Sequence, residues 1–123
     1  MPKMKVTVTA DIDGQVVAGT PYSKVVDIDE SQSFSYEEAN DGDTSTFSAI
    51  PADQLATIKV LLVKPDQQVN IRLDGASDAG ILLSAGGFLA IVDATIDAGA
   101  GSSNAKVNNN SGSTALLKGA AGG

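Results

Sequence analysis

The chain of 123 residues contains no cysteine, no histidine and no tryptophan. Without cysteine there is no disulfide, no thiolate nucleophile and no cysteine-based metal site. Without histidine the usual general base near neutral pH is missing, so Ser-His-Asp and Cys-His catalysis are excluded. Carboxylate-pair catalysis remains possible, but no spacing in the sequence favours a particular pair. We therefore expect a protein that is not an enzyme and that holds no cofactor.

Long apolar runs are also missing from the sequence. No stretch approaches the roughly 18 apolar residues of a membrane-spanning helix. The N-terminal sequence MPKMKVTVTADID has no apolar run of signal-peptide length. We expect a protein that is made in the cytoplasm, is soluble and has no membrane partner. The length suits one domain, 1–123.

The negative charge is concentrated in the first part of the chain. The formal net charge is −7, and Met1–Asp53 alone contains ten acids and three lysines. Seven of these acids, and no Lys or Arg, lie between Asp27 and Asp43. Because such a surface repels phosphate backbones, direct nucleic-acid binding is disfavoured. The charge favours a basic protein partner or a cation, or it serves solubility alone.

Polarity alternates with period two in several short segments, which is typical of half-buried strands. In Lys3–Asp13 the apolar residues occupy every second position, and Val69–Leu73 repeats the pattern. Short strands separated by turn residues predict an all-β fold with little or no helix. We expect about nine or ten strands in an antiparallel β-sandwich or jelly-roll-like arrangement.

Further strands are predicted where β-branched and apolar residues cluster between turns. They are Tyr22–Asp29, Ser31–Tyr36, Thr44–Ile50, Thr57–Lys64, Ile81–Leu83, Phe88–Val92, Ala105–Asn108 and Thr114–Lys118. Asp13-Gly14 is a favoured hairpin turn, and Pro51–Ala56 has the pattern of a helical turn. Val60–Val63 and Phe88–Val92 are wholly apolar, so we expect both in central, buried strands.

Two ends of the chain are predicted to differ from the sandwich. Residues 1–38 suit an N-terminal arm or hairpin extension. Residues 119–123 are Gly- and Ala-rich and predict a flexible tail, or one held by a neighbouring molecule.

Three residues are candidates for binding. Asp41 and Asp43 lie in an acidic loop, EEANDGD, which has the oxygen ligands that calcium prefers. The same residues also suit a solvated loop, and no ligand spacing identifies a metal site. Arg72 is the only arginine and a candidate interface anchor, because arginine is enriched at binding hot spots. A solvated or cross-strand role is the alternative for Arg72.

The C-terminal half has a recognisable order of patterns. NIRLDG is followed by ILLSAGG, by FLAIVDATI and then by KVNNNSGSTALLKG. This order resembles small β-sandwich virion proteins of tailed bacteriophages, over about the last 65 residues. The resemblance lies in pattern and composition, and it carries over no functional residue.

The resemblance implies a structural role in the virion. We expect a capsid decoration (cement) protein that forms a homo-oligomer, with a trimer favoured, and that binds the major capsid protein or other virion proteins. The alternatives are a tail or head–tail junction protein, and a small module that binds calcium or carbohydrate on the particle surface.

Overall fold

The computed structural model describes residues 2–51, 55, 57–73, 80–97 and 105–123. These residues form strands and no helix, as the sequence predicts. Accordingly, the described ranges contain no helix long and apolar enough to cross a membrane. The strands are β1 (Lys3–Val8), β2 (Asp11–Ile12), β3 (Gln15–Val16), β4 (Tyr22–Asp27), β5 (Ser31–Glu38), β6 (Ser48–Ala49), β7 (Thr57–Pro65), β8 (Val69–Arg72), β9 (Ile81–Leu83), β10 (Leu89–Asp97), β11 (Lys106–Asn108) and β12 (Ala115–Gly122).

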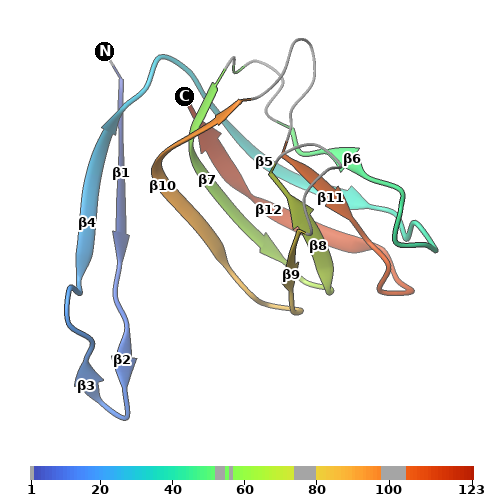
Figure 1. Ribbon diagram of the computed structural model, residues 1–123, viewed down its shortest axis with the longest axis horizontal. Helices are drawn as coiled ribbons and strands as arrows, with labels where there is room; N and C mark the ends of the chain where they lie inside the picture. The colour runs from blue at the N-terminus through green and yellow to red at the C-terminus, as the bar shows by residue number, and fades with distance from the viewer. Residues whose placement is uncertain (1, 52–54, 56, 74–79, 98–104) are drawn as a thin grey trace.

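Two four-stranded antiparallel sheets face each other in a β-sandwich (Figure 1). One sheet has the order β10-β7-β12-β5, and we call it the β7 sheet. The other has the order β6-β11-β8-β9, and we call it the β8 sheet. The core between them contains fully buried side chains from both sheets, among them Ile58, Leu61, Val63, Leu117, Val69, Ile71 and Val107. The predicted all-β sandwich is confirmed.

The remaining four strands form a projecting hairpin, which we call the arm. β1 pairs with β4 along its whole length, and β2 pairs with β3 at the far end of the hairpin (Figure 1). The turn at the tip is Asp13-Gly14, and both residues have positive φ (51° and 81°). That conformation matches the two-residue turn predicted from the Asp-Gly pair. The arm was predicted to extend over residues 1–38. Because β5 (Ser31–Glu38) belongs to the β7 sheet, the arm ends at Asp27 instead.

The base of the arm lies against the outer face of the β7 sheet. Lys24 of the arm forms an ion pair of 3.2 Å with Asp93 of β10. Val60 and Leu62 face the arm, whereas Leu61 and Val63 face the sandwich core. Val60–Val63 is therefore apolar throughout because both of its faces are covered, as expected for a central strand. The apolar cluster at the arm consists of Val6, Val26, Ile28 and Val60, with Met4, Leu62 and Val92 packed around it.

The end of the chain is a central strand, and the predicted tail at 119–123 is wrong. Gly119–Gly122 continue β12, which pairs with β7 on one side and β5 on the other. Gly123 then exchanges backbone hydrogen bonds with Glu30 in both directions, at 3.0 Å each. Small residues are needed here because the chain packs closely on both sides, so this segment lacks the alternating pattern that marks a strand.

Two further predictions differ from the structure in detail. The apolar run Phe88–Val92 predicts a central strand, but β10 is an edge strand and Phe88 is 57% exposed. Its Leu89 and Ile91 pack on the core, while Phe88 and Ala90 face outward beyond the arm. The strand predicted at Thr44–Ile50 is reduced to β6, because Asp43 caps a turn over its first residues. Most of the helical turn predicted at Pro51–Ala56 lies outside the described residues.

Replacing Gly119 by alanine should destabilise the protein strongly. A Cβ atom at Gly119 would lie 1.8 Å from the backbone oxygen of Leu62 and 2.8 Å from Cζ of Phe34. We expect Gly119→Ala to lower the free energy of unfolding by about 3 kcal/mol, measured by urea denaturation. Ser33→Ala, on the exposed face of the adjacent β5, is the control and should change it by less than about 0.5 kcal/mol. A Gly119→Ala variant as stable as the control would contradict this close approach of β12 and β7.

Candidate functional site

The loops at one end of the β8 sheet are held together by a buried asparagine. Asn109 is 0% exposed. Its amide nitrogen donates to the backbone oxygens of Glu38 (2.9 Å) and Ser113 (2.8 Å). Its amide oxygen accepts from the backbone nitrogen (3.1 Å) and hydroxyl (2.7 Å) of Ser111. Both ends of the side chain are therefore satisfied, and the residue joins the end of β5 to the turn before β12.

Asn108, the residue before Asn109, holds the acidic loop against β11 by hydrogen bonds. Its amide nitrogen donates to the backbone oxygens of Asp43 (2.9 Å) and Thr46 (2.8 Å) and lies 3.4 Å from Oδ2 of Asp41. Oδ2 of Asp41 also accepts from the backbone nitrogen of Asn109 at 2.8 Å. The Asp41 carboxylate thus acts as a bridge between the loop and β11.

Asp43 caps the next turn of the same loop. Its Oδ1 accepts from the backbone nitrogens of Ser45 and Thr46, both at 2.9 Å, and its Oδ2 accepts from the Thr46 hydroxyl at 3.1 Å. The Ser45 and Thr46 N–H groups lower the pKa of Asp43 below its ordinary value, because they bind the ionised form. Asp43 therefore stabilises the loop above the ordinary carboxyl pKa, and this contribution falls as pH drops through the lowered pKa.

Glu38 is a buried acid beneath the loop, with 9% of its surface exposed. Burial raises its pKa, a hydrogen bond with Ser48 opposes that change, and the negative charge of Asp41 adds to it. An acid whose pKa is raised by folding favours the folded state increasingly as pH falls from the raised pKa towards the ordinary value. Glu38 and Asp43 therefore have opposite effects on stability in acid.

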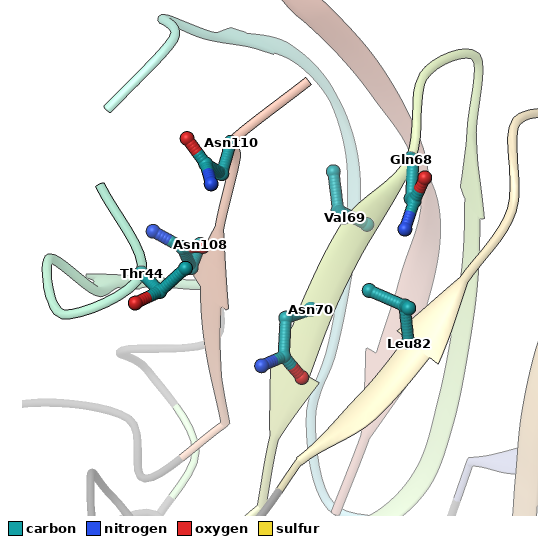
Figure 2. Close-up of a pocket in the computed structure, with 7 residues that line it drawn as sticks. All are labelled: Thr44, Gln68, Val69, Asn70, Leu82, Asn108 and Asn110. Carbon is teal, nitrogen blue, oxygen red and sulfur yellow. The ribbon is translucent and has the colours of Figure 1, made fainter. Parts of the chain in front are cut away.

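A shallow pocket of about 220 Å³ lies beside this junction, on the outer face of the β8 sheet (Figure 2). Three of its residues form a row across adjacent strands, because Asn108 is directly opposite Asn70, and Asn70 is opposite Leu82. Figure 2 shows Thr44 and Asn110 on the side of the loop and Gln68 on the opposite side. Gly80 contacts Asn70 so closely that a Cβ there would lie 2.1 Å from its Oδ1.

The side chains that line this pocket carry no charge. Its lining residues are three asparagines, one glutamine, one threonine, one valine and one leucine. Carboxamides donate and accept hydrogen bonds but do not take up or release protons near neutral pH. The volume is also below the roughly 300 Å³ at which small-molecule pockets begin. The pocket suits a hydroxyl- or amide-bearing group at most one ring in size, and it offers no group for acid–base catalysis.

The two acids proposed as cation ligands lie together on one loop. The side-chain nitrogen of Asn108 lies between the Asp41 carboxylate and the Asp43 backbone oxygen, where a cation would need oxygen ligands alone. Among the described residues, no group of three or more metal-binding side chains is arranged to hold an ion. The structure thus gives both carboxylates a role in holding the loop.

Arg72 lies on the outer face of β8, directly opposite Lys106. Its guanidinium carbon is 4.0 Å from the centre of the Phe47 ring, a cation–π contact worth about 0.5–1 kcal/mol at a partly exposed site. Arg72 therefore helps to attach the acidic loop to the sheet. Sequence reasoning missed the pocket and the Asn109 contacts. The run Asn108-Asn109-Asn110 was their only signal, and it indicated no more than a turn.

Changing Asn109 to aspartate should open this junction, because the new carboxylate would face the Glu38 and Ser113 carbonyl oxygens without a donor. We expect Asn109→Asp to lower the free energy of unfolding by about 3 kcal/mol at pH 7. Burial would raise the pKa of the introduced carboxyl, so the loss should shrink as pH falls. Asn110→Asp, on the exposed neighbour, is the matched control with the same charge change. Equal stability of the two variants in urea denaturation at pH 7 would rule out the buried role of Asn109.

Comparison of the chain with protein-family models, with curated proteins and with solved structures finds no match.

Proposed function

We propose that the chain is a non-enzymatic structural protein that assembles with neighbouring molecules, most specifically a decoration protein of a tailed-bacteriophage head. The single observation that carries the structural role is the arm. Ile12 and Val16 at its tip are 68% and 66% exposed, whereas Val6 and Val26 at its base are buried. A projecting hairpin with apolar side chains in solvent is typical of a surface that is covered on assembly.

The lack of catalytic groups in the pocket on the β8 sheet supports a non-enzymatic role. The pocket on the β8 sheet is lined by carboxamides, a hydroxyl and aliphatic side chains. Asp43 accepts hydrogen bonds from Ser45 and Thr46 of its own loop, and Asp41 accepts one from the backbone nitrogen of Asn109 at the end of β11. The carboxyl near Asp41 is that of Glu38, which is buried and is not among the residues that line the pocket.

The virion role rests on the resemblance of the C-terminal half to small phage β-sandwich proteins, and on charge. Asp29, Glu30 and Glu37 are exposed acids along the β4–β5 connection and the β5 edge of the β7 sheet. They offer a surface for a basic patch on a major capsid protein. Each copy would add buried area across shell subunits and so resist the outward pressure of packaged DNA.

A tail or head–tail junction position is the alternative within the same particle. There the pocket on the β8 sheet favours a second role, the recognition of a neutral sugar or peptide group, because its lining is uncharged and rich in carboxamides. This role requires neither the acidic loop nor a metal ion.

The number of copies per particle separates these positions. We expect quantitative mass spectrometry of purified particles to give a copy number in a simple ratio to the major capsid protein, and particles stripped of this chain to open at a lower temperature. A few copies per particle, with unchanged heat resistance, would exclude decoration and favour the tail. Absence from particles would exclude the virion role altogether.

A further inference from the structure

The tip of the arm carries apolar side chains that its own sandwich leaves uncovered. Val8 and Tyr22 are directly opposite each other, on the face that is buried at Val6 and Val26 nearer the base. Their exposed fractions are 37% and 40%, and Ile12 and Val16 beyond them are more exposed still. Figure 1 shows β2 and β3 at the end of the arm farthest from the arm's contact with the sandwich. The apolar face of the arm thus continues through Val8 and Tyr22 past the sheet that covers its base. At the tip, Ile12 and Val16 lie on opposite faces of the hairpin, because Ile12 pairs with Gln15 and Val16 pairs with Asp11.

A second uncovered surface lies on the outer face of the β7 sheet. Lys64 and Lys118 are directly opposite each other on β7 and β12, on the same face as Leu62. Phe88 shares that face, because it is two residues before Ala90, the partner of Leu62. A depression of about 210 Å³ is lined here by Lys64, Pro65, Asp66, Gly86, Leu116 and Lys118. We call this surface the lysine patch.

The two surfaces have complementary charge. The arm tip is acidic, and the patch has two lysines and one acid, Asp66, whose Oδ1 accepts from the backbone nitrogen of Leu116 at 2.7 Å. The arm tip contains Asp11 and Asp13, and the sequence has no Lys or Arg between Val6 and Ser23. In the described part of the chain, the ion pairs are Lys3–Asp27 and Lys24–Asp93, so neither the tip acids nor the two patch lysines take part in one. Like charges directly opposite each other in a sheet are unfavourable, and an acidic partner would relieve the repulsion between Lys64 and Lys118.

We propose that the arm tip of one copy docks on the lysine patch of a second copy. Ile12 would cover Phe88 and the adjoining depression, and Asp13 in the turn next to Ile12 would face Lys64 and Lys118. The proposal rests on the proposed function, and it names the partner of the arm as this chain itself. Because two different surfaces meet in each contact, copies either exchange arms in a twofold-symmetric dimer or follow one another head to tail in a ring or an open chain.

A mixing experiment tests this pairing. The arm variant is Ile12→Asp, and the patch variant is Lys64→Glu together with Lys118→Glu. Wild-type protein should show a mass above the 12.4 kDa of one chain in sedimentation equilibrium, at concentrations up to about 1 mM because a contact of this size is weak. Each variant alone should associate about tenfold or more weakly. Lys5→Glu, an exposed change on the arm away from its tip, is the control and should associate like wild type.

The mixture gives the decisive result. The patch variant keeps an intact arm and the arm variant keeps an intact patch, so an equimolar mixture should form a complex of one copy of each. A mixture that stays monomeric, or an arm variant that still associates, would overturn the proposal. So would wild-type protein that is monomeric at every concentration, since the tip would then close on its own sheet or bind another molecule.

This outcome is separable from that of the proposed function. Protein that is monomeric in these tests but abundant on particles would leave the decoration role standing and remove the copy-to-copy contact. Protein that associates through the arm but is absent from particles would support the copy-to-copy contact and exclude the decoration role.

Discussion

The close packing of β12 between β7 and β5 is the constraint on which the rest of the structure depends. At Gly119 the strand leaves no room for a Cβ atom beside the Leu62 carbonyl, and at Gly122 a Cβ would press on Met4 and Ile28 at 3.2–3.3 Å. The absence of a side chain at Gly119 allows β12 to pair closely with β7. The absence of a side chain at Gly122 allows the base of the arm to lie on the β7 sheet. One run of small residues therefore fixes both the sandwich and the direction of the arm.

The other end of the sandwich depends on side-chain amides. Asn109 connects backbone groups of β5 with the turn before β12, and Asn108 connects β11 with the acidic loop. These contacts use the carboxylates that the sequence offers as a cation site. The loop is thus organised by hydrogen bonds, whereas the arm tip leaves the apolar side chains of Ile12 and Val16 in solvent.

The strands were largely predictable because each has a local signal. Alternation in Val69–Leu73 and the Asp13-Gly14 turn depend on neighbouring residues alone, and the structure confirms both. The second half of β12, Gly119–Gly122, had no such signal, because its residues are small for a tertiary reason: β7 and the arm approach them closely. Phe88 was wrongly predicted to be buried. In a wholly apolar run, the sequence does not show which face of the strand is covered and which is exposed. The candidate site was less predictable for the same reason. Asn109 and the Glu38 carbonyl that it binds are 71 residues apart, and no spacing rule connects them.

The central claim is that the arm is an assembly surface, and amide hydrogen exchange measured at several protein concentrations tests it most directly. Protection of the tip amides, from Val8 to Tyr22, should increase with concentration, while that of β7 and β12 should stay constant because the sandwich is already formed. Exchange at the tip that does not change with concentration, and does not change on purified particles, would contradict the account.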